Sequence, residues 1–215
     1  MKNNAAGFTI FECAIVVLVT GLLFSGLLRA NELVNAARTR VLAGDLHTVR
    51  TAFHAYRDRF HALPGDHLLV ADALPGAATA TTPGGETGNG RIDGLWDSLI
   101  TTDESYLLWQ HLRLAGYVAG VIDPAAPDYP PRNSIGTRVG ISSRMQIRRP
   151  TAMSGSHSTC MADVPGELAR RLDVYMDDGD TATGSLRISA AASPDEALPT
   201  AAVTDGGMYI VCLSL

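Results

Sequence analysis

An uninterrupted apolar segment near the N-terminus is the feature that most restricts how this 215-residue chain can fold. Residues 8–28 read FTIFECAIVVLVTGLLFSGLL, and Glu12 is their only formal charge. As a helix that rises about 1.5 Å per residue, this segment spans a hydrocarbon core of roughly 30 Å. It is longer than the apolar region of a secretory signal peptide, and no small-x-small cleavage site follows it before Arg29. We therefore expect residues 8–28 to form a membrane-spanning helix that stays with the protein.

Glu12 is unusual in such a segment. A charged carboxylate near the centre of a bilayer costs on the order of 2.5–3.5 kcal/mol on insertion scales, and ionisable groups inside membranes usually mark function. One interpretation is that Glu12, close to the start of the span, simply reaches the lipid headgroups. The other is that it neutralises a positively charged amine on a neighbouring subunit.

The residues around Glu12 resemble the N-terminal signal of type IV prepilins and pseudopilins. A short polar leader, MKNNAAG, is followed by Phe-Thr-Ile-Phe-Glu and the apolar helix. The resemblance implies that prepilin peptidase cuts between Gly7 and Phe8 and methylates the new N-terminal Phe8. It also implies that Glu12 is the carboxylate that guides assembly with other pilin or pseudopilin subunits. The resemblance covers residues 1–66, with one departure: many pilins carry a kinking proline near the membrane exit, whereas no proline precedes Pro64 here.

The distribution of basic residues and the prepilin resemblance predict opposite orientations of the chain in the membrane. Lys2 is the only basic residue before the span, while Arg29, Arg38 and Arg40 follow it, an asymmetry that favours a cytoplasmic domain. The prepilin resemblance implies a single-pass inner-membrane protein whose globular domain is periplasmic. After assembly, that domain would lie in a pilus or pseudopilus at the cell surface or in the periplasm. We therefore predict that the globular domain is periplasmic.

Beyond Arg29 the helical pattern becomes one-sided, because a single stripe of apolar residues recurs every three or four positions. The stripe consists of Leu42, Leu46, Val49, Phe53, Tyr56 and Phe60. It predicts that this half of the helix packs on a globular domain, the alternative being a coiled-coil dimer. Pro64 and Gly65 end the pattern, so one helix is expected from Phe8 to near Ala62. The predicted organisation is a leader (1–7), a membrane half (8–28), an amphipathic half (29–62) and a globular domain (63–215).

The globular part mixes helices and strands. Residues 71–94 have little periodicity and are expected to form a surface loop. A helix is predicted from Asp103 to near Gly116, and another from Glu167 to Met176 with an ion pair between Glu167 and Arg171. Strands are expected within residues 136–147, 186–188 and 208–213. Without β-α-β alternation, these elements predict an α+β, pilin-like fold in which the long N-terminal helix packs on an antiparallel sheet.

The three cysteines are informative through their positions. Cys13 lies in the membrane segment, which leaves Cys160 and Cys212 as the pair in the globular part. In an oxidising compartment they are expected to form a disulfide, the alternative being two independent buried thiols. The resemblance favours the disulfide, because pilins often fasten a C-terminal segment to their sheet in this way.

Two acidic segments are weak candidates for calcium. Asp177, Asp178 and Asp180 surround a glycine and could hold Ca²⁺, or they could form a solvated turn. Residues 88–94, GNGRIDG, resemble the centre of an EF-hand, but the flanking positions lack the required carboxylates. Three histidines recur every seven residues, too far apart on a helix to share a metal ion: His47, His54 and His61. We predict no cofactor.

Composition and motifs argue against several classes of function. With 17 Lys and Arg against 22 Asp and Glu, and no basic run, the chain lacks the electrostatic footprint of a nucleic-acid-binding protein. No nucleophile-elbow, zinc-protease or P-loop motif is present, so we do not expect an enzyme. The predicted function is that of a structural subunit of a type IV pilus or a type II secretion pseudopilus. The size of the globular part favours a minor pilin. The alternative is a bitopic, inner-membrane-anchored periplasmic enzyme or ligand-binding protein.

Overall fold

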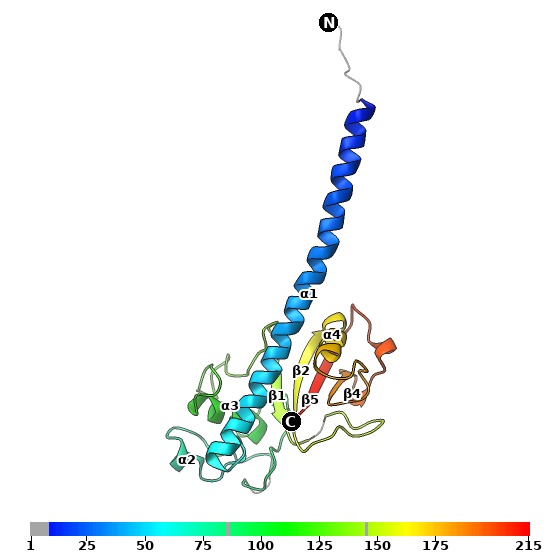
Figure 1. Ribbon diagram of the computed structural model, residues 1–215. Helices are drawn as coiled ribbons and strands as arrows, with labels where there is room; N and C mark the ends of the chain where they lie inside the picture. The colour runs from blue at the N-terminus through cyan, green and yellow to red at the C-terminus, as the bar shows by residue number, and fades with distance from the viewer. Residues whose placement is uncertain (1–8, 85–86, 145) are drawn as a thin grey trace. The chain divides into compact units, whose positions relative to one another are not determined.

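The computed structural model describes residues 9–84, 87–144 and 146–215, except for the side chains of residues 25–28. The chain forms two compact units, Met1–Arg38 and Thr39–Leu215. The elements, coloured along the chain in Figure 1, are α1 (Ile10–Phe60), α2 (Val70–Ala73), α3 (Glu104–Leu114), β1 (Val139–Ser142), β2 (Ser158–Pro165), α4 (Gly166–Met176), β3 (Leu186–Ala190), β4 (Ser193–Ala197), the 3₁₀ helix η1 (Thr200–Ala202) and β5 (Met208–Ser214).

Helix α1 is continuous over 51 residues, and its second half contributes one side to the core of the Thr39–Leu215 unit. Leu42, Leu46 and Tyr56 are fully buried there, which confirms the predicted stripe and its packing within the same chain. The helix ends at Phe60, two residues before the predicted end, because His61 adopts a left-handed backbone conformation with φ of 53°.

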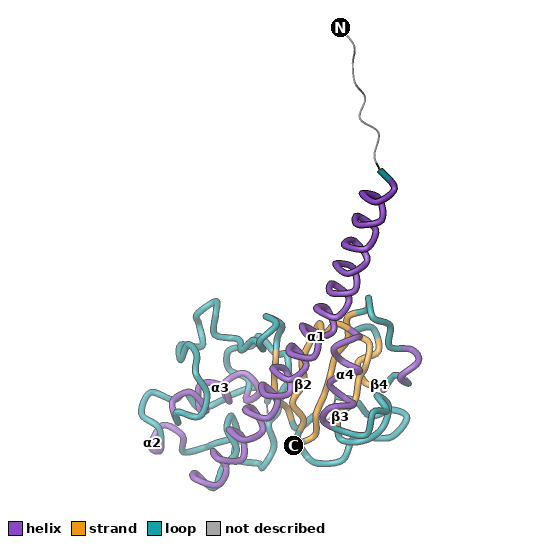
Figure 2. The backbone as a smooth tube through the Cα atoms, turned by 45° about the horizontal axis from the view of Figure 1, so that its top comes forward, coloured by secondary structure: helices purple, strands orange, loops and turns teal. Residues whose placement is uncertain are grey.

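The five strands form one antiparallel sheet in the order β1-β2-β5-β3-β4. Figure 2 shows α4 and the second half of α1 on the same face of these strands. Residues of α1, α4 and the sheet belong to one hydrophobic core, so an α+β fold with a long helix packed on an antiparallel sheet is confirmed.

Strand β5 lies inside the sheet and is buried on both faces. Tyr209, Val211 and Leu213 belong to the main core, whereas the alternating residues Ile210 and Cys212 belong to a smaller core on the other face. The smaller core also contains Trp96, Ile147 and Met153. Side chains alternate between the faces of a strand, so the unbroken apolar run of β5 reflects burial on both sides.

Several predicted elements are confirmed and others are corrected. Helices α3 and α4 lie where they were expected, and the Arg171 and Glu167 side chains are 3.1 Å apart. The predicted strand at 136–147 is limited to β1, and strands β2 and β4 were not predicted. Residues 71–94 are not simply a surface loop, because Leu74, Ala77, Ala80 and Ile92 are buried.

Candidate functional site

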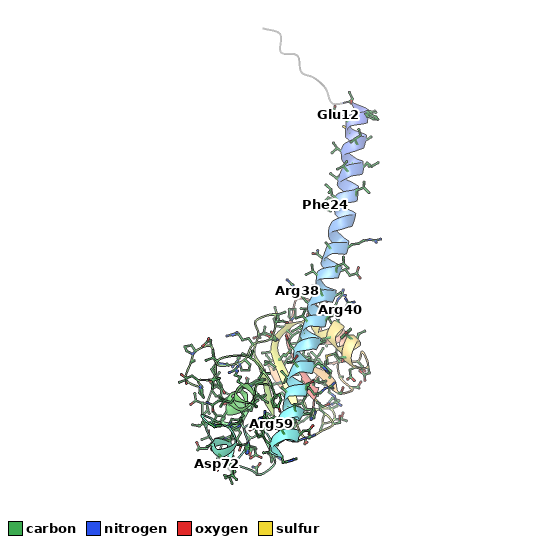
Figure 3. The ribbon with its side chains drawn as sticks, turned by 60° about the vertical axis from the view of Figure 1, so that its left-hand side comes forward. Glu12, Phe24, Arg38, Arg40, Arg59 and Asp72 are labelled. Carbon is green, nitrogen blue, oxygen red and sulfur yellow. A yellow bond between two sulfur atoms is a disulfide. The ribbon has the colours of Figure 1, made fainter. Side chains whose placement is uncertain are left out.

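The first half of α1 exposes apolar side chains on all sides. The large apolar residues from Ile10 to Phe24 are 46–92% exposed, including the consecutive residues Val16, Val17, Leu18 and Val19. Four consecutive positions cover the full circumference of a helix. Figure 3 shows these side chains extending away from the helix, with Glu12 near its start. Among the described residues, α1 is the one helix long and apolar enough to cross a membrane, with a mean hydropathy of 2.3 over its most apolar window.

Glu12 lies in the first turn of α1 and forms a capping box with Thr9. The Thr9 N–H and hydroxyl both donate to Glu12 Oε2 at 3.4 Å, and the Glu12 N–H donates to Thr9 Oγ1 at 3.3 Å. This reciprocal arrangement satisfies donors at the helix start that have no partner within the helix. The sequence signal for this capping box is Thr-x-x-Glu at Thr9 and Glu12, although the capping box was not predicted. The predicted cleavage and methylation positions, Gly7 and Phe8, lie outside the described residues.

Cys160 and Cys212 form the predicted disulfide. They lie directly opposite each other on β2 and β5, with Cα atoms 4.1 Å apart and an S–S distance of 2.10 Å. Both cysteines are fully buried in the smaller core. The bond therefore joins two neighbouring strands on the sheet face opposite α1 and α4. Cys13 is a free, exposed thiol in the apolar half of α1.

The acidic segment after α4 gathers carboxylates, although not the predicted set. Ligand atoms of Asp177 and Asp178 lie within 4.8 Å of one another and of Asp173, a residue that was not predicted. Asp180 is not part of this group; its Oδ1 accepts the N–H of Ala182 at 3.1 Å. Asp173 is fully buried, whereas Asp178 is exposed.

The glycine-rich loop at residues 88–94 surrounds a carboxylate instead of a cation. Asp66 is 3% exposed and accepts backbone N–H groups from Gly88, Asn89, Gly90 and Arg91, the last three at 3.1, 2.7 and 3.1 Å. Converging N–H groups form a concavity that suits an anion. The resemblance of this loop to a calcium site is therefore wrong, and the loop instead attaches to the turn that ends α1.

A buried polar network surrounds the end of α1. The Tyr56 hydroxyl is 2.7 Å from His67 Nδ1, and the Gly65 N–H donates to His111 Nδ1 at 2.9 Å. His111 Nε2 is 2.9 Å from the Ala78 carbonyl oxygen, so the neutral ring that accepts from Gly65 donates to Ala78. Burial lowers the pKa of His111 to about 4, which keeps the ring neutral. These hydrogen bonds connect the turn after α1 to α3 and to the segment around Ala78.

A hollow of about 480 Å³ lies beside the smaller core. It is lined by Trp96 and Ile210 of that core and by charged side chains of both signs, namely Asp97, Arg138, Arg144, Arg148, Asp163 and Asp195. Three arginines face three aspartates, so the lining has no net charge to favour an ionic ligand. A ligand-binding domain, the predicted alternative, requires a pocket in which a few polar groups converge on the ligand. The mixed charges that line this hollow do not point to one class of ligand.

No protein-family model, curated protein or solved structure matches this chain.

Proposed function

We propose that this protein is a pilin-like structural subunit, a minor pilin or pseudopilin, whose mature form begins at Phe8. It assembles through the apolar half of α1 into a type IV pilus or a type II secretion pseudopilus. The observation that carries this proposal is a helix apolar on all sides, with one carboxylate in its first turn, that follows a prepilin-like leader. The same helix continues without a break into residues that pack on an antiparallel sheet.

The two halves of α1 suit two environments. The apolar half exposes side chains in every direction, and such a helix is stable when lipid or other apolar helices cover it. In the membrane the cover is lipid, and in a fibre it is the same half of neighbouring subunits. The second half belongs to the core of the globular unit, so the surface available for assembly lies in the first half.

Glu12 is proposed to recognise the amine created by processing. Cleavage after Gly7 gives Phe8 a positively charged amino group, and the Glu12 carboxylate carries the opposite charge. In an apolar surrounding, such a pair attracts strongly, and an unpaired carboxylate is costly. The amine of one subunit and Glu12 of its neighbour therefore favour one register between helices. The capping box with Thr9 holds the carboxylate at the helix start, where this contact would form.

The proposed location is the inner membrane, with the globular domain in the periplasm. The Cys160–Cys212 disulfide supports this orientation, because such bonds persist in oxidising compartments such as the periplasm. This support is independent of the leader. The disulfide and the charge asymmetry across the apolar segment favour opposite orientations. We propose that the processing signal outweighs the charge asymmetry and determines the orientation.

Coexpression with a prepilin peptidase tests the proposal directly. Intact-mass analysis and N-terminal sequencing should show loss of MKNNAAG and a methylated Phe8. Gly7→Leu should block the cut, because a cleft that fits glycine has no room for a branched side chain. Ala5→Leu, a matched change two positions away, should still be processed.

Two results would overturn the assignment: an intact leader on the parent protein, or normal processing of the Gly7→Leu variant. An intact leader would favour a protein that only uses a similar anchor, such as a membrane-attached periplasmic enzyme or ligand-binding protein.

A further inference from the structure

Three carboxylates meet at the C-terminal end of α4. Asp173 lies in the last turn, Asp177 is the C-cap residue, and Asp178 follows it, with one ligand atom of each within 4.8 Å of the others. A helix C-terminus carries a partial negative charge that favours cations. The last turn of α4 contains no basic residue to supply one. The arrangement therefore concentrates negative charge where the helix itself disfavours it.

Asp173 is the most informative member. Its side chain is fully buried, and neither carboxylate oxygen has a hydrogen-bond partner among the described residues. Burial, followed by the charges of Asp178, Asp177 and Asp180, raises the pKa of Asp173 to about 7. The Gly179 N–H opposes this effect without reaching hydrogen-bonding geometry. A buried carboxylate without a partner requires either a proton or a cation.

The loop between α4 and β3 holds the other two carboxylates in place. Asp177 accepts the Ser185 hydroxyl at 3.0 Å and the Leu186 N–H at 2.8 Å. Asp178 accepts the Asp180 N–H at 2.9 Å and the Thr183 hydroxyl at 2.7 Å. Each carboxylate oxygen keeps a further lone pair for a ligand.

Gly184 is part of this arrangement. Its φ is +71°, and a Cβ at this position would overlap the carboxylate of Asp177. The loop is thus shaped around the two carboxylates before any ion binds.

We propose that Asp173, Asp177 and Asp178 form a binding site for a calcium ion. An all-oxygen set suits a hard cation and does not suit zinc, which prefers nitrogen and sulfur ligands. Calcium accepts irregular geometry and completes its shell with backbone carbonyls and water, whereas magnesium requires near-ideal octahedral geometry. The nearby Arg187 donates to the carbonyl oxygens of Gly184 and Thr151, and among the described residues it forms no ion pair with the three carboxylates. A bound ion would fasten the end of α4 to the start of β3.

The test uses the full, oxidised chain in a nonionic detergent after treatment with EDTA. Calorimetric titration with CaCl₂ should show one ion bound per chain, with a Kd of about 10⁻⁴–10⁻³ M, as in extracellular modules. At a concentration of about 100 times Kd, the unfolding temperature should rise by roughly 5–10 °C. NaCl at matched ionic strength should not reproduce this rise.

Asp173→Asn should lose both the calorimetric signal and the thermal shift. Asp72→Asn, the same change at an exposed carboxylate on α2, should retain both. If Asp173→Asn does not fold, Asp178→Asn and the titration of the parent protein decide the matter.

Three results would overturn the site. The parent could show no heat and no shift with CaCl₂, which would mean that Asp173 is satisfied by a proton alone. Asp173→Asn could respond like the parent, or NaCl could act like CaCl₂, which would indicate general screening. None of these outcomes depends on pilus assembly, so the proposed function is tested separately.

Discussion

Replacing Glu104 with glutamine should remove a large part of the pH dependence of folding. Glu104, the first residue of α3, is 4% exposed, and its Oε2 accepts the Asp93 N–H at 2.7 Å. Burial, assisted by the neighbouring carboxylates of Asp66 and Asp93, raises the pKa of Glu104 to about 7, although the Asp93 N–H opposes the rise. The folded protein therefore holds a proton at a pH where the unfolded chain has released it.

The sign and size of the effect follow from this difference. A raised pKa gives stability that is fully present below the unfolded pKa and is lost as the pH rises through the folded pKa. A change from 4.5 to about 7 corresponds to roughly 3 kcal/mol of unfolding free energy. Glutamine resembles the protonated acid, because its carbonyl can accept from Asp93 and its amide can donate to Asp66. It does not ionise, so this contribution no longer varies with pH.

The measurement is urea unfolding of the full chain in detergent with EDTA, followed by the fluorescence of the two buried tryptophans, Trp96 and Trp109. Between about pH 5 and pH 8, Glu104→Gln should gain roughly 2–3 kcal/mol of stability relative to the parent. The contribution of Asp173 is present in both proteins and cancels. Glu167→Gln, at a partly exposed ion pair, should show no such trend. An offset between parent and Glu104→Gln that stays constant across this pH range would refute the reasoning.

Two further predictions concern the disulfide and the proposed role of Glu12 in assembly. Reducing the Cys160–Cys212 bond should lower the free energy of unfolding by roughly 4 kcal/mol, since it closes a loop with a sequence separation of 52. Non-reducing peptide mapping of periplasmic material should find the bond, and two free thiols there would contradict the proposed orientation. Glu12→Gln keeps a capping-box residue but removes the charge, so it should reach the membrane yet fail to enter fibres. Thr9→Ala removes the cap and keeps the charge, so it should still be incorporated. If Thr9→Ala failed to enter fibres while Glu12→Gln entered them normally, Glu12 would act only as a helix cap.

The sequence was most informative where a local pattern determines the structure. The spacing of Leu42, Leu46 and Phe53 revealed one buried face, because helical period and burial coincide along that stretch. The disulfide could be predicted because only Cys160 and Cys212 remained outside the apolar segment.

Strands β2 and β4 could not be predicted, for different reasons. In β2, a register shift between Met161 and Val164 interrupts the alternation, since both residues enter the main core although they are three positions apart. Strand β4 is polar, contains Pro194 and lies at the sheet edge, so its composition resembles a turn.

The polar sites depended on contacts between distant residues. Asp66 looked like part of a helix-ending turn, but its partners are N–H groups that lie 22–25 positions later. Asp173 was not among the predicted residues, and its burial depends on how the chain packs around the end of α4. In both cases the chemistry arises from tertiary packing, which one sequence does not encode as a local pattern.

The position of β5 between β2 and β3 affects the order in which the domain can form. Both neighbours precede it in the chain, so each leaves the ribosome with one edge still unpaired. Long-range pairing of this kind slows folding and leaves strand edges open to other chains. The sheet can close only after Met208–Ser214 has arrived. If the protein is the proposed fibre subunit, a copy that met its neighbours before that moment would present two open β edges to them, so the proposal requires the last strand to insert before assembly.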